Sequence, residues 1–419
     1  WNLGGIQTLL LKYKNYFFAT LVLNQELLSN FTILYIETAT ARRTDERNRY
    51  TDKNNFIGGL ILVIESINDF LKEKDNQQKS INANLIFDGR GLPQRLFYRG
   101  QSNDYEGSNN VASIFRKGTK KDGYTHEYSV TNEYMRRYAN DFSNLENNFS
   151  RLSYMQHFGL PTRLLDVTTN ALVALYFACQ SNVEDYKTEG IVNMFISNKE
   201  QAIDNYTYYN SRSDTVEVLS TLALMDEVKK KVIYDNISSF NQKIDNLLRE
   251  DKNCLYRKWY MDKIKQFPEG YYEQLPEEDK KIYNSLNDIY DCINQSYEVQ
   301  CLYHDIKRDI GYFADLINFR TLLHPFFVEP SFNNNRLRAQ SGFFLFEPYD
   351  RTSYTLKNIQ DDINRKVALH NTNKESIKLI IPGNAKEKIL KELDQSFEIN
   401  QATLFPDKEN VAQYIKNYF

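Results

Sequence analysis

The sequence predicts an α+β fold in which strands from both ends of the chain meet across a long helical insertion. Short apolar and aromatic runs bounded by glycine or proline, which are typical of strands, occur before residue 200 and after residue 340. Between them, residues 200–330 keep the three- and four-residue apolar spacing of amphipathic helices. The 16 glycines and 9 prolines among 419 residues are about half the usual share, which argues against a turn-dense all-β fold.

The first part of the chain is predicted to be mostly helical. Residues 1–61 form an N-terminal helical region in this interpretation, and helical spacing continues through residues 64–71. The first half of the core, residues 62–199, then contains a strand at residues 96–98. We expect this strand to end at Arg99 and the backbone to turn tightly at Gly100.

The densest run of motif residues lies between residues 155 and 170. It predicts a loop containing His157, a short buried strand over Arg163–Val167 and a turn. Thr168–Asn170 then supplies the N-cap of a buried helix over Ala171–Cys179. A further strand is predicted at Ile191–Ile196.

The second half of the core, residues 331–419, follows the helical insertion of residues 200–330. Strands are predicted at Gly342–Phe346 and Ile377–Ile381, and a helix at Ala385–Leu393. Strands so widely separated must meet to form one sheet. Arg99 and Gln340 are therefore expected to share a cleft.

Composition excludes several classes of protein. The 52 cationic and 55 anionic residues give a net charge of −3, so a strongly basic nucleic-acid coat is excluded, although a local basic groove is not. The four cysteines lack metal-type spacing, and no metal is predicted. Apolar runs fall far short of the ~20 residues that a membrane span needs. We expect a soluble, cytoplasmic protein without membrane association.

Polar residues at the strand edges are the candidates for a site, and each also has a structural interpretation. Arg99 can present its guanidinium to a phosphate or carboxylate, or form a structural ion pair. Arg163 and Asp166 can pair with each other or with neighbours across the sheet. Thr168–Asn170 can cap a helix or bind phosphate at its N-terminus. Arg336, Arg338 and Gln340 precede a strand, either as site residues or as an exposed strand start.

Several blocks of the sequence resemble one family. Tyr98-Arg99-Gly100-Gln101 resembles the motif that names the FRG-domain family of bacterial and phage proteins. Met155–Asp166 resembles the most specific signature of that family almost position for position. Ser113–Arg116, Glu127 and Arg338–Phe343 are similar to its other blocks. The resemblance covers about residues 62–419, with residues 200–330 as a variable insertion.

This family is similar to the ADP-ribosyltransferases, which cleave the nicotinamide–ribose bond of NAD. The resemblance implies a split β-sheet core, NAD as substrate and no metal. It implies a catalytic set of Arg99, Thr168 and Gln340. It also implies an NAD-binding set of Tyr98, Arg99, Gln101, Arg116, His157, Arg163 and Thr169. Gln340 carries no negative charge, so a carboxylate would have to come from Glu347 or Glu329.

The resemblance implies a toxin or effector of phage defence that transfers ADP-ribose to a macromolecule. Arg116, Arg336 and Arg338 slightly favour nucleic acid, RNA above all, over protein as acceptor. An antitoxin or other neutralising partner is expected, and residues 226–320 offer a surface for it. The alternatives are a non-catalytic module that binds a nucleotide or a phage component, and an NAD glycohydrolase.

Overall fold

The computed structural model describes residues 59–83, 94–105, 107–116, 127–180, 188–197, 207–248, 253–263, 270–331, 334–348, 356–371 and 376–418. Residues from Leu62 onward form one compact unit. The predicted N-terminal helical region lies outside the described residues, apart from its last three.

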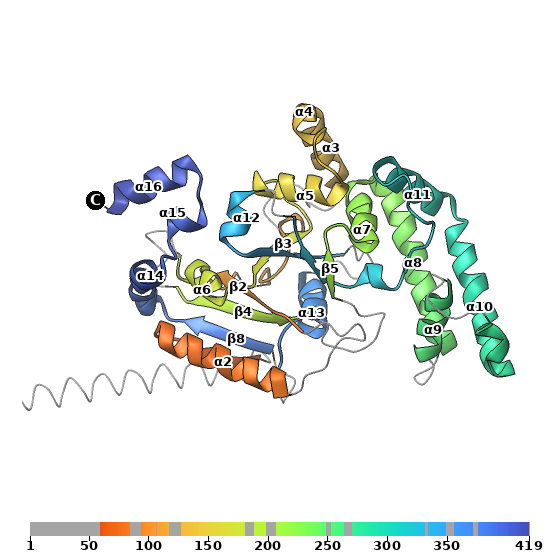
Figure 1. Ribbon diagram of the computed structural model, residues 1–419, viewed down its shortest axis with the longest axis horizontal. Coiled ribbons are helices and arrows are strands. Elements are labelled where there is room, and N and C mark those ends of the chain that lie inside the picture. Colours follow the sequence, from red (N-terminus) through yellow and green to blue (C-terminus); the bar gives the residue numbers. More distant parts are fainter. Residues whose placement is uncertain are drawn as a thin grey trace, which may run out of the picture. The chain divides into compact units, whose positions relative to one another are not determined.

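The core is one mixed eight-stranded sheet with the order β1-β8-β4-β2-β3-β7-β6-β5 (Figure 1). Its strands, in that order, are Gly59–Val63, Ser376–Ile381, Gly190–Ile196, Leu96–Gln101, Leu164–Thr168, Gly342–Phe346, Phe326–Glu329 and Tyr208–Asn210. The predicted α+β class is thus confirmed, and strands from both ends of the chain do meet in one sheet.

The sheet consists of two halves that join between β2 and β3. Within the described strands, β2 and β3 pair only at Tyr98 and Thr168. By contrast, β2 pairs with β4 along its whole length, and β3 pairs with β7 from Leu164 to Thr168. Backbone pairing at the junction between the halves is therefore limited to one residue pair.

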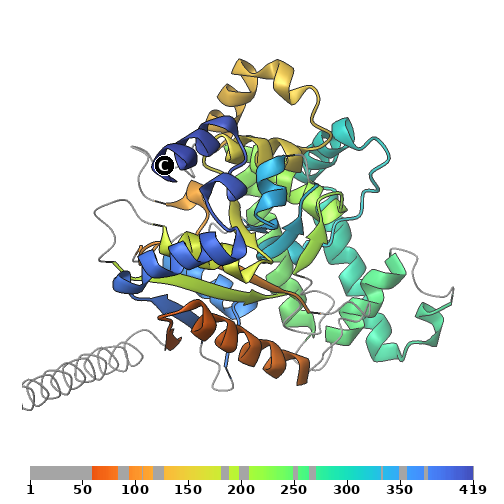
Figure 2. The same ribbon diagram turned by 60° about the vertical axis from the view of Figure 1, so that its left-hand side comes forward.

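Helices cover the two faces of the half that contains β2 (Figures 1 and 2). On one face, α2 (Ile67–Ala83), α6 (Ala171–Cys179) and α14 (Gly383–Phe397) share a hydrophobic core with β4 and β8. The opposite face of the sheet packs against α13 (Leu356–Lys366) and the short turn Ser113–Phe115. Both α6 and its N-cap Asn170, whose Oδ1 accepts from Leu172 N at 3.0 Å, agree with the sequence prediction.

The half that contains β7 carries most of the helical insertion. The insertion forms α7 (Asp214–Leu224), α8 (Glu227–Leu248), α9 (Asn253–Lys263), α10 (Glu277–Asn294) and α11 (Tyr297–Asp309). These helices share a core with α5 (Asn148–His157) and with β6 and β7. The remaining α-helices of the described residues are α3 (Glu127–Arg137), α4 (Ala139–Phe142), α12 (Asn335–Ala339), α15 (Gln401–Leu404) and α16 (Lys408–Tyr418).

The sequence did not predict β1, β5 or β6. Residues 59–63 directly precede a helical pattern, so their apolar run was predicted as part of the helix that follows. Strand β5 is only three residues long, and β6 is a four-residue run buried on both faces, without period-2 alternation. Such short strands carry too little pattern to be distinguished from the helices around them.

Gly100 was predicted to turn the chain, and this prediction is wrong, because β2 continues through Gln101. A methyl group on Gly100 would lie 1.8 Å from Ala174 O, and one on Gly190 would lie 2.1 Å from Ala178 O. The two glycines therefore allow α6 to approach the sheet closely. This contact holds the middle and the C-terminal end of α6 against β2 and β4.

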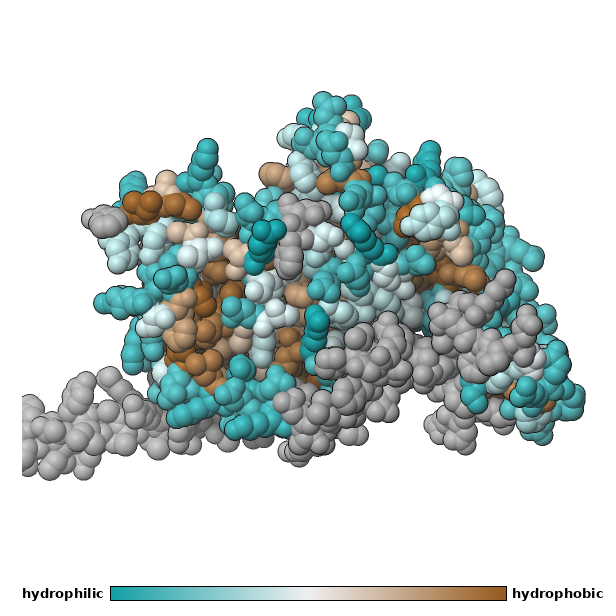
Figure 3. All heavy atoms as spheres, in the orientation of Figure 1, coloured by the Kyte–Doolittle hydropathy of each residue, from teal (hydrophilic) through white to brown (hydrophobic). Residues whose placement is uncertain are grey.

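The surface shown in Figure 3 is mostly hydrophilic, with apolar side chains gathered around α6. None of the helices in the described part of the chain combines the length and the apolar composition needed to span a membrane.

Candidate functional site

The C-terminal end of β3 contacts the segment that leads into β7. Thr168 Oγ1 donates to Gln340 O at 2.7 Å and accepts from Asn170 N at 3.0 Å. Thr169 N donates to Ser341 O at 3.2 Å. The structure therefore brings together Thr168 and Gln340, which lie 172 residues apart in the sequence.

The sequence predicted that residues 336–342 open a strand, and this prediction is wrong for Gln340. Residues Asn335–Ala339 form the short helix α12, whose N-cap Asn334 accepts from Leu337 N, and Gln340 is its C-cap. The Gln340 amide donates through Nε2 to Leu404 O at 3.1 Å. This side chain therefore helps to hold α15 against the site.

Arg99 lies within β2, where β2 and β3 separate. Its Nη1 donates to Asp166 O at 2.7 Å, so its guanidinium bridges the two halves of the sheet. Among the described residues, Arg99 Nε has no hydrogen-bond partner. Burial, followed by the charge of Arg116, lowers the pKa of Arg99 to about 10. Arg99 and Gln340 thus both bond to β3, two residues apart. Arg99 bonds to the backbone of Asp166, and the backbone of Gln340 bonds to the side chain of Thr168.

The buried carboxyl group of Glu347 interacts electrostatically with Arg99. Glu347, just after β7, accepts from Ala112 N at 2.7 Å through Oε1, and Arg116 Nε donates to Val111 O in the same loop at 2.8 Å. Burial raises the pKa of Glu347 to about 8, although Arg116 and Arg99 act in the opposite direction. Of the two glutamates considered from the sequence, Glu329 is instead bonded to Tyr208 through its Oε2.

Arg163 was predicted to bind the cofactor, but the structure engages it elsewhere. Its side chain is 1% exposed and donates to Glu127 through Nε and Nη2, at 2.7 and 2.6 Å. Lys230 of α8 donates to the same carboxylate at 2.7 Å. Arg163 is therefore not paired with Asp166, and its partners join the signature segment to α3 and to the insertion.

His157 was predicted to lie in a loop. It is instead the last residue of α5, and its exposed ring lies edge-on to the Phe158 ring at 4.9 Å between centroids. Gln101 faces away from α6 and bonds to Asn109 at 3.2 Å and to Asn193 at 3.1 Å. Gln101, Arg116 and Arg99 thus share the α13 side of the sheet.

An open cavity of about 750 Å³ lies at the N-terminus of α6. Two residues of the predicted NAD-binding set, Tyr98 and Thr169, line it. Lys74 and Arg95 add positive charge, and Arg95 Nη1 also donates to Tyr208 OH at 2.8 Å. The sequence motifs did not reveal these two cations, because they lie outside the motif blocks and only the fold brings α2 beside the start of β2.

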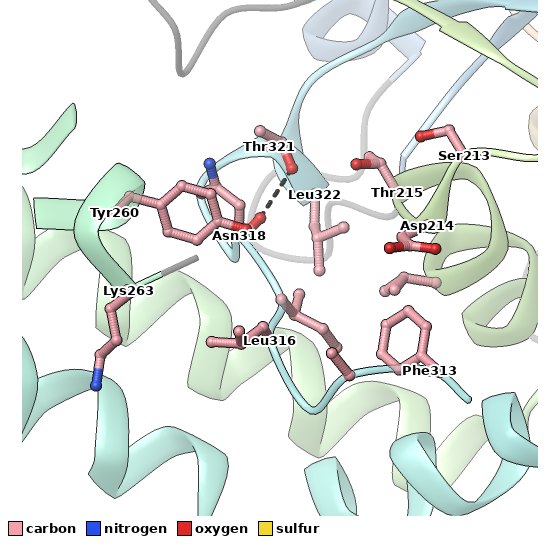
Figure 4. A pocket seen from close by; sticks show the side chains of 13 residues that line it. Ser213, Asp214, Thr215, Tyr260, Lys263, Phe313, Leu316, Asn318, Thr321 and Leu322 are labelled. Carbon is pink, nitrogen blue, oxygen red and sulfur yellow. Dashed lines mark hydrogen bonds between the residues drawn. The ribbon is translucent and has the colours of Figure 1, made fainter. Parts of the chain in front are cut away.

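The predicted site residues are therefore not gathered in one place. Tyr98 and Thr169 line the 750 Å³ cavity, next to the bond between Thr168 and Gln340. The other face of β2 carries Arg99. A separate cavity of about 480 Å³, between the start of α7, α9 and residues 313–322, was not predicted (Figure 4). In the described residues, no three His, Cys, Asp or Glu side chains are grouped to hold a metal ion.

Comparison with known families addresses the motif blocks directly. Residues 94–187 match the FRG domain. This segment of the chain is an FRG domain. It contains β2, α3, α5, β3 and α6, and thus both the Tyr98–Gln101 motif and the Met155–Asp166 signature. No match was found among curated proteins or among solved structures.

Within the FRG domain, the signature residues mainly fix β3. Gln156 Nε2 donates to Leu164 O at 3.0 Å and to Asp166 Oδ2 at 3.2 Å. The Thr162 hydroxyl donates to Gln156 Oε1. Arg163 is buried with Glu127. The signature thus holds the strand that presents Thr168 and Thr169 at the cavity.

Proposed function

We propose that the protein is an NAD-dependent ADP-ribosyltransferase that binds NAD in the 750 Å³ cavity at the N-terminus of α6. The observation that carries this proposal is the position of the cavity at the N-terminus of α6, with Tyr98 and Thr169 in its lining and the bond between Thr168 and Gln340 beside it. Its volume lies within the range of about 300–1,000 Å³ found for small-molecule sites.

The cavity offers the contacts that a dinucleotide needs. The positive end of the α6 dipole suits a pyrophosphate, and the Thr169 hydroxyl adds a donor. The N–H of Leu172 already donates to the N-cap Asn170. Lys74 and Arg95 contribute positive charge. Tyr98 and Phe343 also line the cavity, with 3% and 6% of their surface exposed.

The residues of the implied catalytic set lie on or next to three neighbouring strands. Arg99 lies on β2, Thr168 on β3, and Gln340 just before β7, in the sheet order β2-β3-β7. In the proposed reaction, the bond between nicotinamide and ribose C1′ breaks and nicotinamide leaves with the electron pair. A nucleophile of the acceptor then bonds to C1′ and releases its proton. The transition state resembles an oxocarbenium ion, so positioning and charge stabilisation dominate catalysis.

Arg99 is assigned a positioning function in this proposal, because its guanidinium holds β3 through Asp166 O. Thr168 acts in the same way on the segment of Gln340. The proposed acceptor is RNA, because Arg336 and Arg338 of α12 lie next to Gln340 in the chain and suit a phosphate backbone. A defence effector of this kind requires a neutralising partner, for which the insertion is the proposed surface.

One observation favours a second function, a module that binds a nucleotide without cleaving it. The Gln340 amide is engaged with Leu404 O, and this residue has no carboxylate with which to stabilise a cation. In this alternative the same cavity senses a nucleotide. An NAD glycohydrolase is the third possibility and would release free ADP-ribose.

The test uses NAD labelled in its adenylate phosphate, incubated with the protein and with RNA, DNA or cellular protein. Transfer predicts label on the macromolecule, RNA above all, and loss of label in Arg99→Ala. Thr169→Val, at an exposed position of the cavity, should weaken NAD binding. Thr215→Val, in the separate 480 Å³ cavity, is the matched control and should not.

The outcomes separate the three functions. Free ADP-ribose without labelled macromolecule would support hydrolysis. Intact NAD that still binds in a Thr169-dependent manner would support the binding module. If NAD neither binds nor reacts, or if Thr169→Val and Thr215→Val behave alike, the proposed site is wrong.

A further inference from the structure

The cavity of about 480 Å³ in the helical insertion is lined by the start of α7, by α9 and by residues 313–322 (Figure 4). It shares no lining residue with the 750 Å³ cavity. Its volume lies within the range of about 300–1,000 Å³ found for small-molecule sites. A ligand bound here would therefore be independent of the proposed NAD site.

One side of this cavity carries three polar side chains that have no partner. They are Ser213, Asp214 and Thr215, which make no side-chain hydrogen bond or ion pair within the described part of the chain. Asp214 is exposed, and Ser213 and Thr215 are half-buried, so all three keep accessible surface. Ser213 is the N-cap of α7, yet its hydroxyl makes no cap bond. These three groups are therefore available to a ligand.

Other polar residues of the lining are already engaged. Asn318 Oδ1 accepts from Tyr256 OH at 3.2 Å, and Thr321 Oγ1 donates to Asn318 O at 2.8 Å. Lys263 Nζ lies 3.4 Å from Asp291 Oδ1. Figure 4 shows the Lys263 amine pointing away from the side of the cavity that carries Ser213 and Thr215. The polar contacts that the cavity can offer are therefore concentrated at the start of α7.

Asp214 gives this side of the cavity a negative charge that no neighbouring cation balances. The cations in or beside the lining segments each have a carboxylate of their own: Lys263 pairs with Asp291, Arg212 with Glu146, Lys307 with Asp315, and Arg320 with Asp245. The positive end of the α7 dipole offsets only about half an elementary charge. An anionic group would be repelled here, whereas a cationic group would gain a counter-charge.

The side of the cavity across from Asp214 supplies apolar surface. Tyr260 and Leu316 lie there and are half-buried, so part of each side chain is accessible (Figure 4). Phe313 and Leu322 also belong to the lining but are only 5% and 1% exposed. A carboxylate with two hydroxyls on one side and apolar surface on the other matches a molecule with a cationic group on an apolar body.

We infer that this cavity binds a small organic cation, an ammonium or guanidinium group attached to an apolar body. The cationic group donates to the Asp214 carboxylate and to the hydroxyls of Ser213 and Thr215, and the apolar body lies against Tyr260 and Leu316. The inference does not depend on the proposed transferase function, because the NAD cavity contributes no residue to this site. Free amines and the basic side chains of peptides share this chemistry, and the arms of the experiment separate them.

The experiment measures binding to the full chain by isothermal titration calorimetry at pH 7. Phenethylamine is the cationic probe, 2-phenylethanol is its uncharged analogue, and phenylacetate is an anion of similar size. Phenethylamine should bind saturably with a Kd on the order of 1 mM, and both analogues should bind at least about tenfold more weakly. Acetyl-lysine methylamide carries its ammonium on a peptide side chain. Binding as tight as that of phenethylamine would indicate a basic side chain as the ligand, and weaker binding would indicate a free amine.

Three variants locate the binding. Asp214→Asn removes the charge and should weaken phenethylamine binding by at least about tenfold. Glu278→Gln is the matched control, because it also removes an exposed carboxylate from the first turn of a helix in the insertion but lies outside the cavity, and it should change binding by less than about twofold. Leu316→Asn keeps the size of the side chain and should weaken binding by at least about threefold through the lost apolar contact. Circular dichroism checks that each variant folds.

Three results would overturn the inference. They are the absence of saturable binding by phenethylamine, binding of 2-phenylethanol or phenylacetate as tight as that of phenethylamine, and equal effects of Asp214→Asn and Glu278→Gln. The first two come from the wild-type chain and do not depend on the folding of any variant. Failure of NAD to bind would leave the inference unaffected.

Discussion

The buried cluster of Glu127, Arg163 and Lys230 gives the sharpest test of how the FRG domain is held to the insertion. The carboxylate of Glu127 is 1% exposed and accepts from both cations, which are 1% and 0% exposed. Glu127→Gln would replace the carboxylate between two buried cations by a neutral amide, although Lys230 would keep Glu227 at 3.4 Å. Removing one partner of a buried ion pair typically costs about 3–5 kcal/mol of unfolding free energy, and we expect a loss of that size here.

The matched control is Glu133→Gln on the same helix. Glu133 also bonds to two arginines, Arg136 and Arg137, but its side chain is 43% exposed and theirs are 70% and 67% exposed. Exposed pairs contribute little, so this variant should lose far less stability than Glu127→Gln. Urea unfolding followed by circular dichroism measures both variants at pH 7. Equal losses in the two variants would refute the reasoning.

The same cluster predicts a dependence on acid. Burial alone would raise the pKa of Glu127, but Arg163 and Lys230 outweigh it and hold the pKa below its ordinary value of 4.5. A lowered pKa contributes stability above the unfolded pKa, and that stability is lost as the pH falls through the folded pKa. The difference between wild type and Glu127→Gln should therefore shrink when the pH falls below about 4.5.

Three further predictions concern single positions. Burial and the charge of Asp309 raise the pKa of Glu217 from 4.5 to about 7. Because the pKa is raised, the free energy of unfolding should fall by up to about 3 kcal/mol as the pH rises through this range. Glu217→Gln should remove that part of the pH dependence, as measured by urea unfolding between pH 4.5 and 8. Gly100→Ala should destabilise by about 3 kcal/mol in thermal unfolding, because its methyl group would collide with the backbone of α6. Gly311→Ala is the control, because its methyl group would lie 4.0 Å from the nearest non-neighbouring atom, Lys307 O. Similar melting temperatures of the two variants would contradict this expectation. Thr168→Val should cost about 1–2 kcal/mol in urea unfolding through the lost bond to the carbonyl of Gln340, and no measurable loss would show that this bond does not hold the segment.

The sequence was sufficient to predict the strands whose patterns are long and clearly bounded. Gly342–Phe346 is strand β7 with the predicted bounds, and the helix over Ala171–Cys179 is α6 with its cap at Asn170. These elements combine continuous apolar runs with glycine or capping residues at their ends. The pairing of strands across the insertion also followed from their separation in the sequence.

Other features could not be read from local pattern, because they depend on contacts between distant segments. Gly100 has the same signature in a tight turn as under a closely packed helix, and only the position of α6 decides between them. The helix over Asn335–Ala339 was not predicted, because two arginines before a strand suggest a polar strand start. Its N-cap Asn334 is the signal in the sequence that indicates a helix. The burial of Arg163 depends on Lys230 in the insertion, 67 residues further along the chain.

These contacts separate the residues of the FRG domain that hold β3 in place from those that line the cavity. Gln156 and Arg163 bond to protein groups and are at least partly buried, whereas Thr169 is exposed at the cavity. Changes to the first two should reduce any activity through the position of β3 and through stability. A change at Thr169 should affect ligand binding while the melting temperature stays near that of the wild type. The most specific residues of the signature thus hold the site in place, and the residues that would contact a ligand lie just beyond its end.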